Sequence, residues 1–170
     1  MQLQSMYQDT ILDHYRNPHG RGLRDPFEAE VHHVNPTCGD EVTLRVHLET
    51  NADGDAILTD VSYEGMGCSI SQASVSAMYD LVIGRSVTDA LGTGEHFVTL
   101  MQSKGDASVA EKLEDELEDA VAFAGVSKYP ARIKCALMSW MALKDASARA
   151  LAATAAPGTQ PTTPVGGDDR

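Results

Sequence analysis

Apolar and polar residues alternate most strictly in the segment EVTLRVHLE, at positions 41–49. This period of two is typical of a strand that buries one face. The apolar residues on that face are Val42, Leu44, Val46 and Leu48. A shorter alternation at 27–34 predicts a strand before it, and residues 57–63, after the turn NADGD, predict a strand after it. Three strands with short connections predict an antiparallel meander.

After the third predicted strand the apolar spacing becomes that of an α-helix. Helical segments are predicted at about 5–16, 70–84, 86–102, 108–125 and 129–146. The glycines of GTG, at 92–94, predict a break in the third segment, and Ser108 and Gly125 predict the cap and the end of the fourth. Strands followed by helices indicate an α+β domain, with a three-stranded antiparallel sheet packed on one face by helices.

The chain of 170 residues is long enough for one domain with a hydrophobic core. We predict this domain at residues 1–153. From 154 to 170 the sequence is rich in Pro, Gly and Thr and has no periodicity, which predicts a disordered tail.

The net charge is −12, from 25 acidic and 13 basic residues, and it should repel the phosphates of nucleic acids. Nucleic acid is therefore not an expected partner, whereas a protein with a basic patch is. No apolar run approaches the roughly 18 residues that span a bilayer. The N-terminal segment has neither a basic start nor a cleavage site, so we expect a cytoplasmic protein without membrane contact.

Three cysteines, an odd number, argue against a disulfide framework in a reducing compartment and leave metal binding or catalysis open. Cys38 lies in the loop sequence NPTCGD, where the backbone can bend around a ligand. Cys68 begins a predicted helix, whose dipole lowers the pKa of a thiol. Cys135 lies in the second turn of the last helix. Taken singly, each cysteine could equally be a small buried apolar residue.

Asp40, two residues after Cys38, could reach the same centre from a curved loop, or could serve only as a turn or capping residue. Three thiolates and one carboxylate would complete a tetrahedral zinc site, and sulfur ligands favour zinc or an iron–sulfur cluster over magnesium or calcium. The paired C-x-x-C spacing of a zinc ribbon is missing from the sequence, so the spacing alone is a weak signal.

Arg132 lies three residues before Cys135, so the two share a helix face, while Lys134 points elsewhere. Arg132 is either an ordinary exposed cation or a positive group held beside thiolates. We give no chemistry to His14 or Tyr15. We expect four other histidines not to be ligands, namely His32, His33, His47 and His96.

Four motifs, LDHYRNP, NPTCGDEVTL, YEGMGCSISQAS and PARIKCALMSW, resemble the IscU/SufU superfamily of iron–sulfur cluster assembly proteins in their order. The resemblance covers about residues 5–145. Within the superfamily the chain is similar to SufU rather than to the IscU scaffold, because Lys134 replaces the histidine of the IscU pattern and because a segment is added around 96–125. The segment NPHGRG departs from the family pattern.

The resemblance implies a zinc site at Cys38, Asp40, Cys68 and Cys135. It also implies that the chain is a sulfurtransferase that accepts persulfide sulfur from a pyridoxal-phosphate (PLP)-dependent cysteine desulfurase of the SufS type and stimulates its turnover. By analogy, a histidine of the desulfurase would displace one zinc ligand and free Cys38, and Arg132 would engage the desulfurase.

Three other functions remain open from the sequence. The same cysteines could carry an iron–sulfur cluster on a scaffold protein. The zinc site could be purely structural, or one cysteine could be the nucleophile of a hydrolase, although no convincing histidine partner is found for it.

Overall fold

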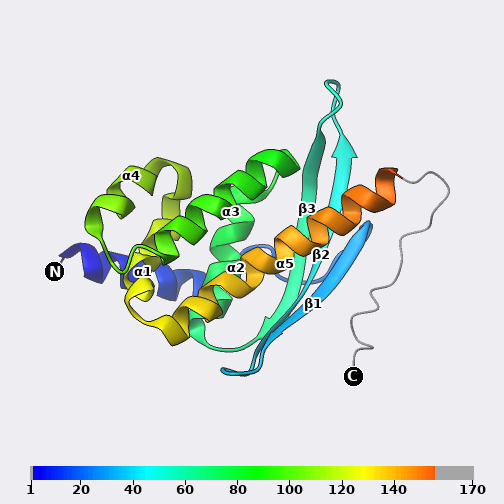
Figure 1. The fold of residues 1–170 in the computed structure, drawn as a ribbon. Coiled ribbons are helices and arrows are strands. Elements are labelled where there is room, and N and C mark those ends of the chain that lie inside the picture. The colour runs from blue at the N-terminus through cyan, green and yellow to red at the C-terminus, as the bar shows by residue number, and fades with distance from the viewer. Residues whose placement is uncertain (1, 156–170) are drawn as a thin grey trace.

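The structure is a computed structural model and describes residues 2–155, with side chains from Tyr7 onward (Figure 1). The elements in chain order are α1 (Gln2–Arg16), β1 (Ala29–Asn35), β2 (Asp40–Thr50), β3 (Ala56–Met66), α2 (Ser69–Val82), α3 (Val87–Met101), α4 (Ala107–Leu117), the 3₁₀ helix η1 (Glu118–Lys128) and α5 (Pro130–Ala155). The last helix enters the first two positions of the predicted tail. The remainder of that prediction, 156–170, lies outside the described residues.

The three strands form one antiparallel sheet in the order β1-β2-β3. In its middle, Leu44 of β2 faces Val31 of β1 and Tyr63 of β3, and all three side chains are buried. Figure 1 shows α5 running across this face of the sheet, where it packs against β1 and β2. The predicted α+β fold, a three-stranded antiparallel sheet with helices on one face, is confirmed.

Helix α2 is buried almost all round, because it packs against both α1 and α5. Small residues on α2 allow this close approach, and the Ser74 hydroxyl donates a 2.7 Å hydrogen bond to the carbonyl of Ala136 in α5. The N-terminal part of α2 and the second turn of α5 are thereby held together. Cys68 immediately precedes α2, and Cys135 lies in that second turn of α5. No helix within residues 2–155 combines the length and apolar character needed to cross a bilayer.

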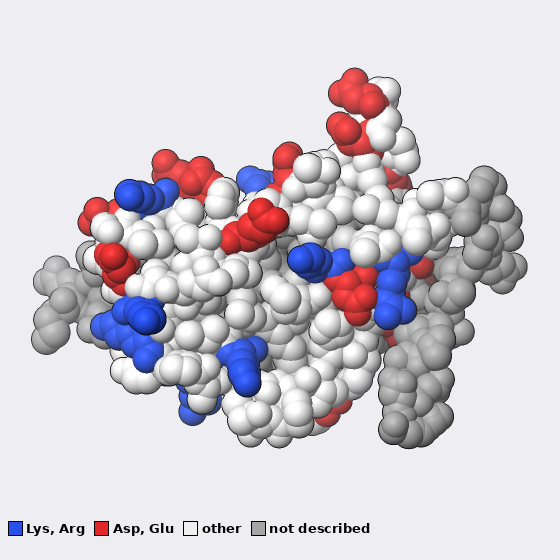
Figure 2. Space-filling view, in the orientation of Figure 1, with Lys and Arg blue, Asp and Glu red and all other residues white. Residues whose placement is uncertain are grey.

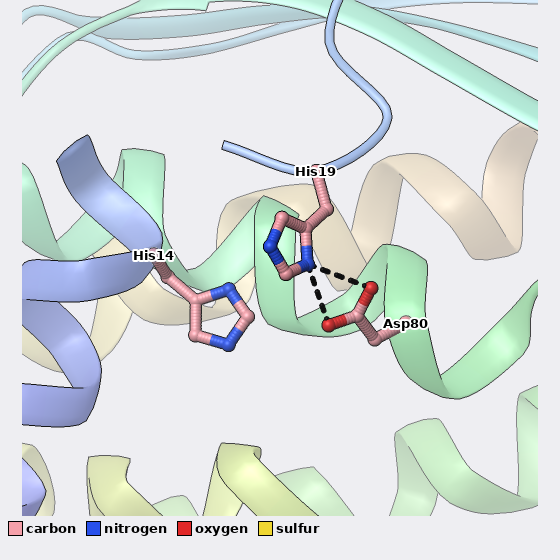
Figure 3. Close-up of side chains that lie close together, drawn as sticks. All are labelled: His14, His19 and Asp80. Atoms are coloured by element: carbon pink, nitrogen blue, oxygen red, sulfur yellow. Dashed lines mark hydrogen bonds and ion pairs between the residues drawn. The ribbon is translucent and has the colours of Figure 1, made fainter. Parts of the chain in front are cut away.

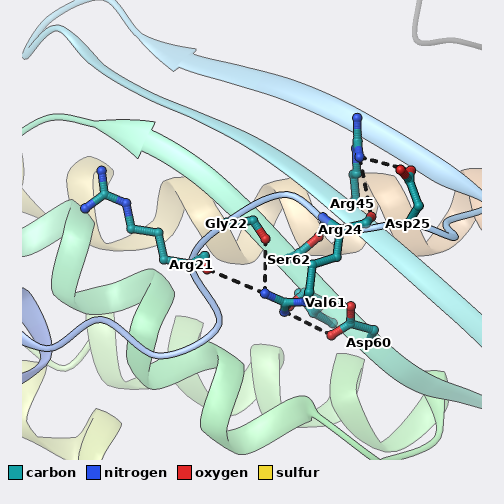
Figure 4. Close-up of polar contacts among 8 residues, drawn as sticks. All are labelled: Arg21, Gly22, Arg24, Asp25, Arg45, Asp60, Val61 and Ser62. Carbon is teal, nitrogen blue, oxygen red and sulfur yellow. Dashed lines mark hydrogen bonds and ion pairs between the residues drawn. The ribbon is translucent and has the colours of Figure 1, made fainter.

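The segment between α1 and β1 runs along the edge of β3, which no other strand of the described chain covers (Figure 4). The Gly22 N–H donates to the Tyr63 carbonyl at 2.7 Å. Arg24 fixes the segment with two 3.0 Å hydrogen bonds to the Asp60 carboxylate and one of 3.1 Å to the Val61 carbonyl. This segment therefore protects an otherwise open sheet edge.

The predicted break at 92–94 is wrong, because α3 continues through both glycines. A Cβ at Gly94 would lie 3.4 Å from the Trp140 ring in α5. This is an ordinary van der Waals distance, so the glycine is not required there. Packing of α3 against α5 and η1 compensates for the low helix propensity of its glycines.

The predicted single helix over 108–125 is also wrong. Asp106, not Ser108, caps α4 by accepting the Ser108 N–H at 2.9 Å, and α4 ends at Leu117. Glu118 has a φ of +45°, which stops the α-helix before η1 begins. Because most of η1 is buried under α1, α3 and α5, its apolar residues do not follow one helical face, and the sequence pattern could not distinguish it from α4.

Candidate metal centre

The four predicted ligands come from separate elements at one end of the sheet. Cys38 lies in the β1–β2 turn, Asp40 begins β2, Cys68 precedes α2 and Cys135 lies in the second turn of α5. Figure 1 shows this turn, the end of β3 and the start of α5 at the same end of the molecule. Residues nearly a hundred positions apart are thus brought into one site.

The sulfur atoms of Cys38 and Cys135 lie 3.3 Å apart, and both lie within 4.8 Å of an Asp40 carboxylate oxygen. Cys68 falls outside this tight group, but its sulfur is 3.8 Å from Asp40 Oδ2. All three cysteines are free thiols. The Asp40 carboxylate therefore lies between the Cys38–Cys135 pair and Cys68, and it is close to all three sulfur atoms.

Asp40 is fully buried, and its two carboxylate oxygens have different roles. Oδ1 accepts the backbone N–H of Cys68 at 2.9 Å, which satisfies a free donor at the start of α2. Oδ2 is the oxygen near the Cys68 sulfur. The capping function that the sequence left open is thus present, and it leaves one oxygen available for a ligand.

Gly67 allows the Asp40 carboxylate to lie close to the start of α2, because a Cβ at position 67 would overlap that carboxylate. Its φ of +150° is also a backbone conformation that L-residues rarely adopt. The glycine before Cys68 is therefore part of the architecture of the site.

Burial raises the pKa of the Cys135 thiol, and the nearby Asp40, Cys38 and Cys68 raise it further. Ionising several such groups together is unfavourable unless a cation balances their charge. Three sulfurs and one carboxylate are also a donor set that suits a soft divalent ion with four ligands. The residues present therefore fit the zinc ion that the sequence suggested.

Arg132 is exposed and lines a cavity of about 450 Å³ together with Cys68 and Tyr129. Residues of α1, α2 and η1 also line this cavity. Among the ion pairs of the described residues none involves Arg132, so its guanidinium is available to a ligand or partner. The cavity places an exposed cation beside one thiol of the centre.

Further basic side chains surround the junction of η1 and α5. On the face shown in Figure 2, basic side chains gather there, whereas acidic ones occupy the tip of the β2–β3 hairpin. Lys104 and Lys128 line a second cavity together with Pro130, the first residue of α5, and Arg132 and Lys134 follow on that helix. All four basic side chains are exposed. We call them the basic rim. Sequence reasoning singled out Arg132 alone, since 104 and 128 are far apart along the chain.

Several histidines make contacts away from this centre. His33 lies 2.9 Å from Asp145 of α5, and His32 lies 3.3 Å from Glu41. His14, to which the sequence gave no chemistry, is buried and bonded on both ring nitrogens. These contacts with carboxylates and hydroxyls hold the three rings outside the group formed by the cysteines and Asp40.

The chain matches the NifU-like N-terminal domain over residues 6–136. It belongs to this family. The zinc-dependent sulfurtransferase SufU of Bacillus subtilis is 42% identical over 149 residues, which cover 86% of this chain and 92% of the relative. An iron–sulfur cluster assembly scaffold protein IscU of Streptococcus pyogenes is 40% identical, with 86% of each chain covered.

A crystal structure from Fervidobacterium islandicum, described as a scaffold protein for the SUF system, has a TM-score of 0.63 and 30% identity. It covers 83% of this chain and 96% of its own. Membership of the IscU/SufU superfamily is therefore confirmed, and the names of the Streptococcus and Fervidobacterium proteins refer to iron–sulfur cluster assembly. The relatives carry both the SufU and the IscU names.

Proposed function

We propose that this protein is a zinc-dependent sulfur acceptor in iron–sulfur cluster assembly, supplied by a SufS-type, PLP-dependent cysteine desulfurase. The observation that carries the proposal is the convergence of Cys38, Cys68 and Cys135 on the buried Asp40 carboxylate, beside the exposed Arg132. The similarity to a relative named as a zinc-dependent sulfurtransferase supports it.

Cys38, Asp40, Cys68 and Cys135 would hold the zinc ion. When bound, zinc keeps coordinated thiols deprotonated at neutral pH and contributes folding energy. Asp40 holds the start of α2 in place through its bond to the Cys68 N–H, whether or not its second oxygen is engaged.

Exposure favours Cys38 over Cys135 as the sulfur acceptor. Cys38 is partly exposed in a short turn, whereas Cys135 is completely buried within α5. The Cys38 thiolate attacks the outer sulfur of the desulfurase persulfide, forming a new S–S bond while the S–S bond of the donor breaks. The donor cysteine leaves as a thiolate, so the step needs no external oxidant or reductant.

Arg132 would bind the negative charge that accompanies this transfer, because it lines the cavity that Cys68 also lines and precedes Cys135 by three residues on α5. A persulfide is an anion, and a guanidinium in the adjoining cavity can donate charge-assisted hydrogen bonds to it or to a carboxylate of the desulfurase. The basic rim extends the same positive surface, so we expect the desulfurase to present acidic groups there.

The deciding experiment combines metal analysis with turnover. The purified protein should contain zinc with little iron or acid-labile sulfide, and it should increase alanine production by a matched cysteine desulfurase. Cys38→Ala should abolish the increase and the persulfide detected on this chain. Undiminished stimulation by a folded Cys38→Ala variant would refute the role of Cys38 as acceptor.

The second candidate function is a scaffold for an iron–sulfur cluster. It is favoured by the 40% identical relative that carries this name and by the same three thiols. In that case anaerobic incubation with iron and sulfide should produce a stable cluster on the protein, and zinc should inhibit rather than support activity. We expect the cytoplasm to be the site of either function.

A further inference from the structure

A second group of metal-binding side chains lies apart from the cysteines. It comprises His14 of α1, His19 of the segment after α1, and Asp80 of α2 (Figure 3). One donor atom from each residue lies within 4.8 Å of the other two. The two imidazole rings approach edge to face, with their centroids 5.0 Å apart.

His14 has the environment of a preorganised metal ligand. It is 1% exposed, and its Nε2 lies 3.0 Å from Asp119 Oδ2 of η1. This contact favours a proton on Nε2 and leaves the lone pair of Nδ1 available, as carboxylates behind metal-binding histidines commonly do. Nδ1 lies 2.7 Å from the hydroxyl of Ser76, which also accepts the backbone N–H of His19. Nδ1 is therefore turned toward the second imidazole.

His19 and Asp80 complete the group from the solvent side. The Nδ1 atom of His19 lies 2.7 and 2.9 Å from the two Asp80 oxygens, and the side chains are 44% and 41% exposed. The backbone of His19 is held at both ends, since Tyr63 donates its hydroxyl proton to the His19 carbonyl at 2.8 Å. The group thus combines a fixed frame with an open entrance for a hydrated ion.

We propose that His14, His19 and Asp80 bind a divalent transition metal ion, with zinc as the representative of the class that prefers imidazole. Two histidines and one carboxylate are a ligand set that holds such ions and leaves positions for water. His19 would bind through Nδ1 after its proton moves to Nε2 or to solvent, and the Ser76 hydroxyl would turn away from His14. The ion would join α1 to α2 and stabilise the N-terminal helix.

Zinc stoichiometry of the full chain tests the proposal, with free Zn²⁺ buffered in the micromolar range. The parent should bind two equivalents, and His19→Ala and Asp80→Asn should each bind one. His47→Ala is the matched control, because His47 also contacts carboxylates, those of Glu28 and Glu49, and it should still bind two. Variants that retain the second equivalent would refute the proposal.

Asp119→Asn provides an independent measurement, because it alters the partner of His14 and no ligand. We expect affinity at this second site to fall by about 10–100-fold, as is typical when the carboxylate behind a ligating histidine is lost. Unchanged affinity would mean that Asp119 does not orient His14.

Cobalt separates this site from the cysteine centre. Thiolate-bound Co²⁺ gives intense near-ultraviolet charge-transfer absorption, whereas imidazole- and carboxylate-bound Co²⁺ gives only weak visible bands. Loss of the charge-transfer band in Cys135→Ala, with the weak bands retained, would show a second site even if the thiol centre failed. If the parent shows the charge-transfer band but binds only one equivalent of cobalt, the proposal of a second site is refuted, while the proposed cysteine centre is not affected.

Discussion

Arg132 and Lys134 are neighbouring cations on α5 with different surroundings. Both are exposed, but only Arg132 lines the cavity beside Cys68. Two residues along a helix correspond to a rotation of about 200°, so the two side chains leave the helix on different sides. Position on the helix, rather than charge alone, distinguishes them.

Arg132→Ala should therefore retain zinc and lose stimulation of the desulfurase. Removing one charge-assisted hydrogen bond is worth about 1.5–3 kcal/mol, so we expect a loss of stimulation of about 10–100-fold. Lys134→Ala removes a charge of the basic rim that does not line this cavity, so it should reduce stimulation less than Arg132→Ala does. Alanine production, with zinc content measured on the same samples, checks the prediction, and equal effects of the two variants would contradict it.

Gly67→Ala should disturb the metal centre directly, because the new methyl group overlaps the Asp40 carboxylate. Overpacking of this kind costs about 1–3 kcal/mol, in addition to the strain of a positive φ. Gly54→Ala, at a φ of +88° with open space around it, carries only the backbone strain. Chemical denaturation and zinc retention should show the larger loss for Gly67→Ala, and a larger loss for Gly54→Ala would refute the steric argument.

At the scale of elements, the candidate metal centre depends on how α2, α5 and the strands are fixed to one another. The Ser74 bond to α5 fixes the helices, and Asp40 fixes the start of β2 to the start of α2. The segment after α1 performs the corresponding task at the edge of β3 through Arg24. Side chains that join neighbouring elements thus hold the parts of the site in place.

Arg24→Ala should destabilise the protein by about 1–3 kcal/mol, since it removes a bidentate, charge-assisted contact and leaves the edge of β3 less well covered. Arg21→Ala is the control on the same segment. Arg21 makes a single 3.3 Å contact with Glu64, and both side chains are about half exposed. We therefore expect Arg21→Ala to lower the free energy of unfolding by only about 0 to 1 kcal/mol. Urea denaturation compares the two, and equal costs would show that the Asp60 contact does not hold the segment.

At the scale of the whole molecule, the surface around the start of α5 is basic, whereas the chain as a whole is acidic. The chain carries a net charge of −12, yet the basic rim lies around the start of α5, the helix that carries Cys135. The net charge by itself favoured a basic partner. The distribution of charge instead predicts that the proposed desulfurase, if it docks at the basic rim, presents acidic groups there.

Removal of zinc should destabilise the whole domain, because the proposed ligands come from the β1–β2 turn, β2, the start of α2 and α5. An ion at about 1,000 times its Kd adds about 4 kcal/mol, which corresponds to about 10 °C in Tm for a domain of this size. The His19→Ala background isolates the thiol centre, and adding Cys135→Ala provides the control. Thermal unfolding with and without a chelator checks the prediction, and an unchanged Tm would contradict it.

Local patterns in the sequence were sufficient for the fold class and for membership of the superfamily. The alternation around Leu44 is encoded in consecutive residues, because a strand with one buried face requires it. The motifs that contain Cys38, Cys68 and Cys135 are equally local, so the amino-acid sequence alone was enough to choose them as candidate ligands. Their function as zinc ligands remains a prediction.

Contacts between distant segments were decided only by the tertiary structure. Packing of α3 against α5 and η1 keeps the helix intact despite its glycines, and burial on several sides hides the boundary between α4 and η1 from any periodicity. The approach of His14 to Asp119 joins residues 105 positions apart. Sequence patterns report the faces of single elements, whereas the meeting of such side chains depends on the packing of the whole chain.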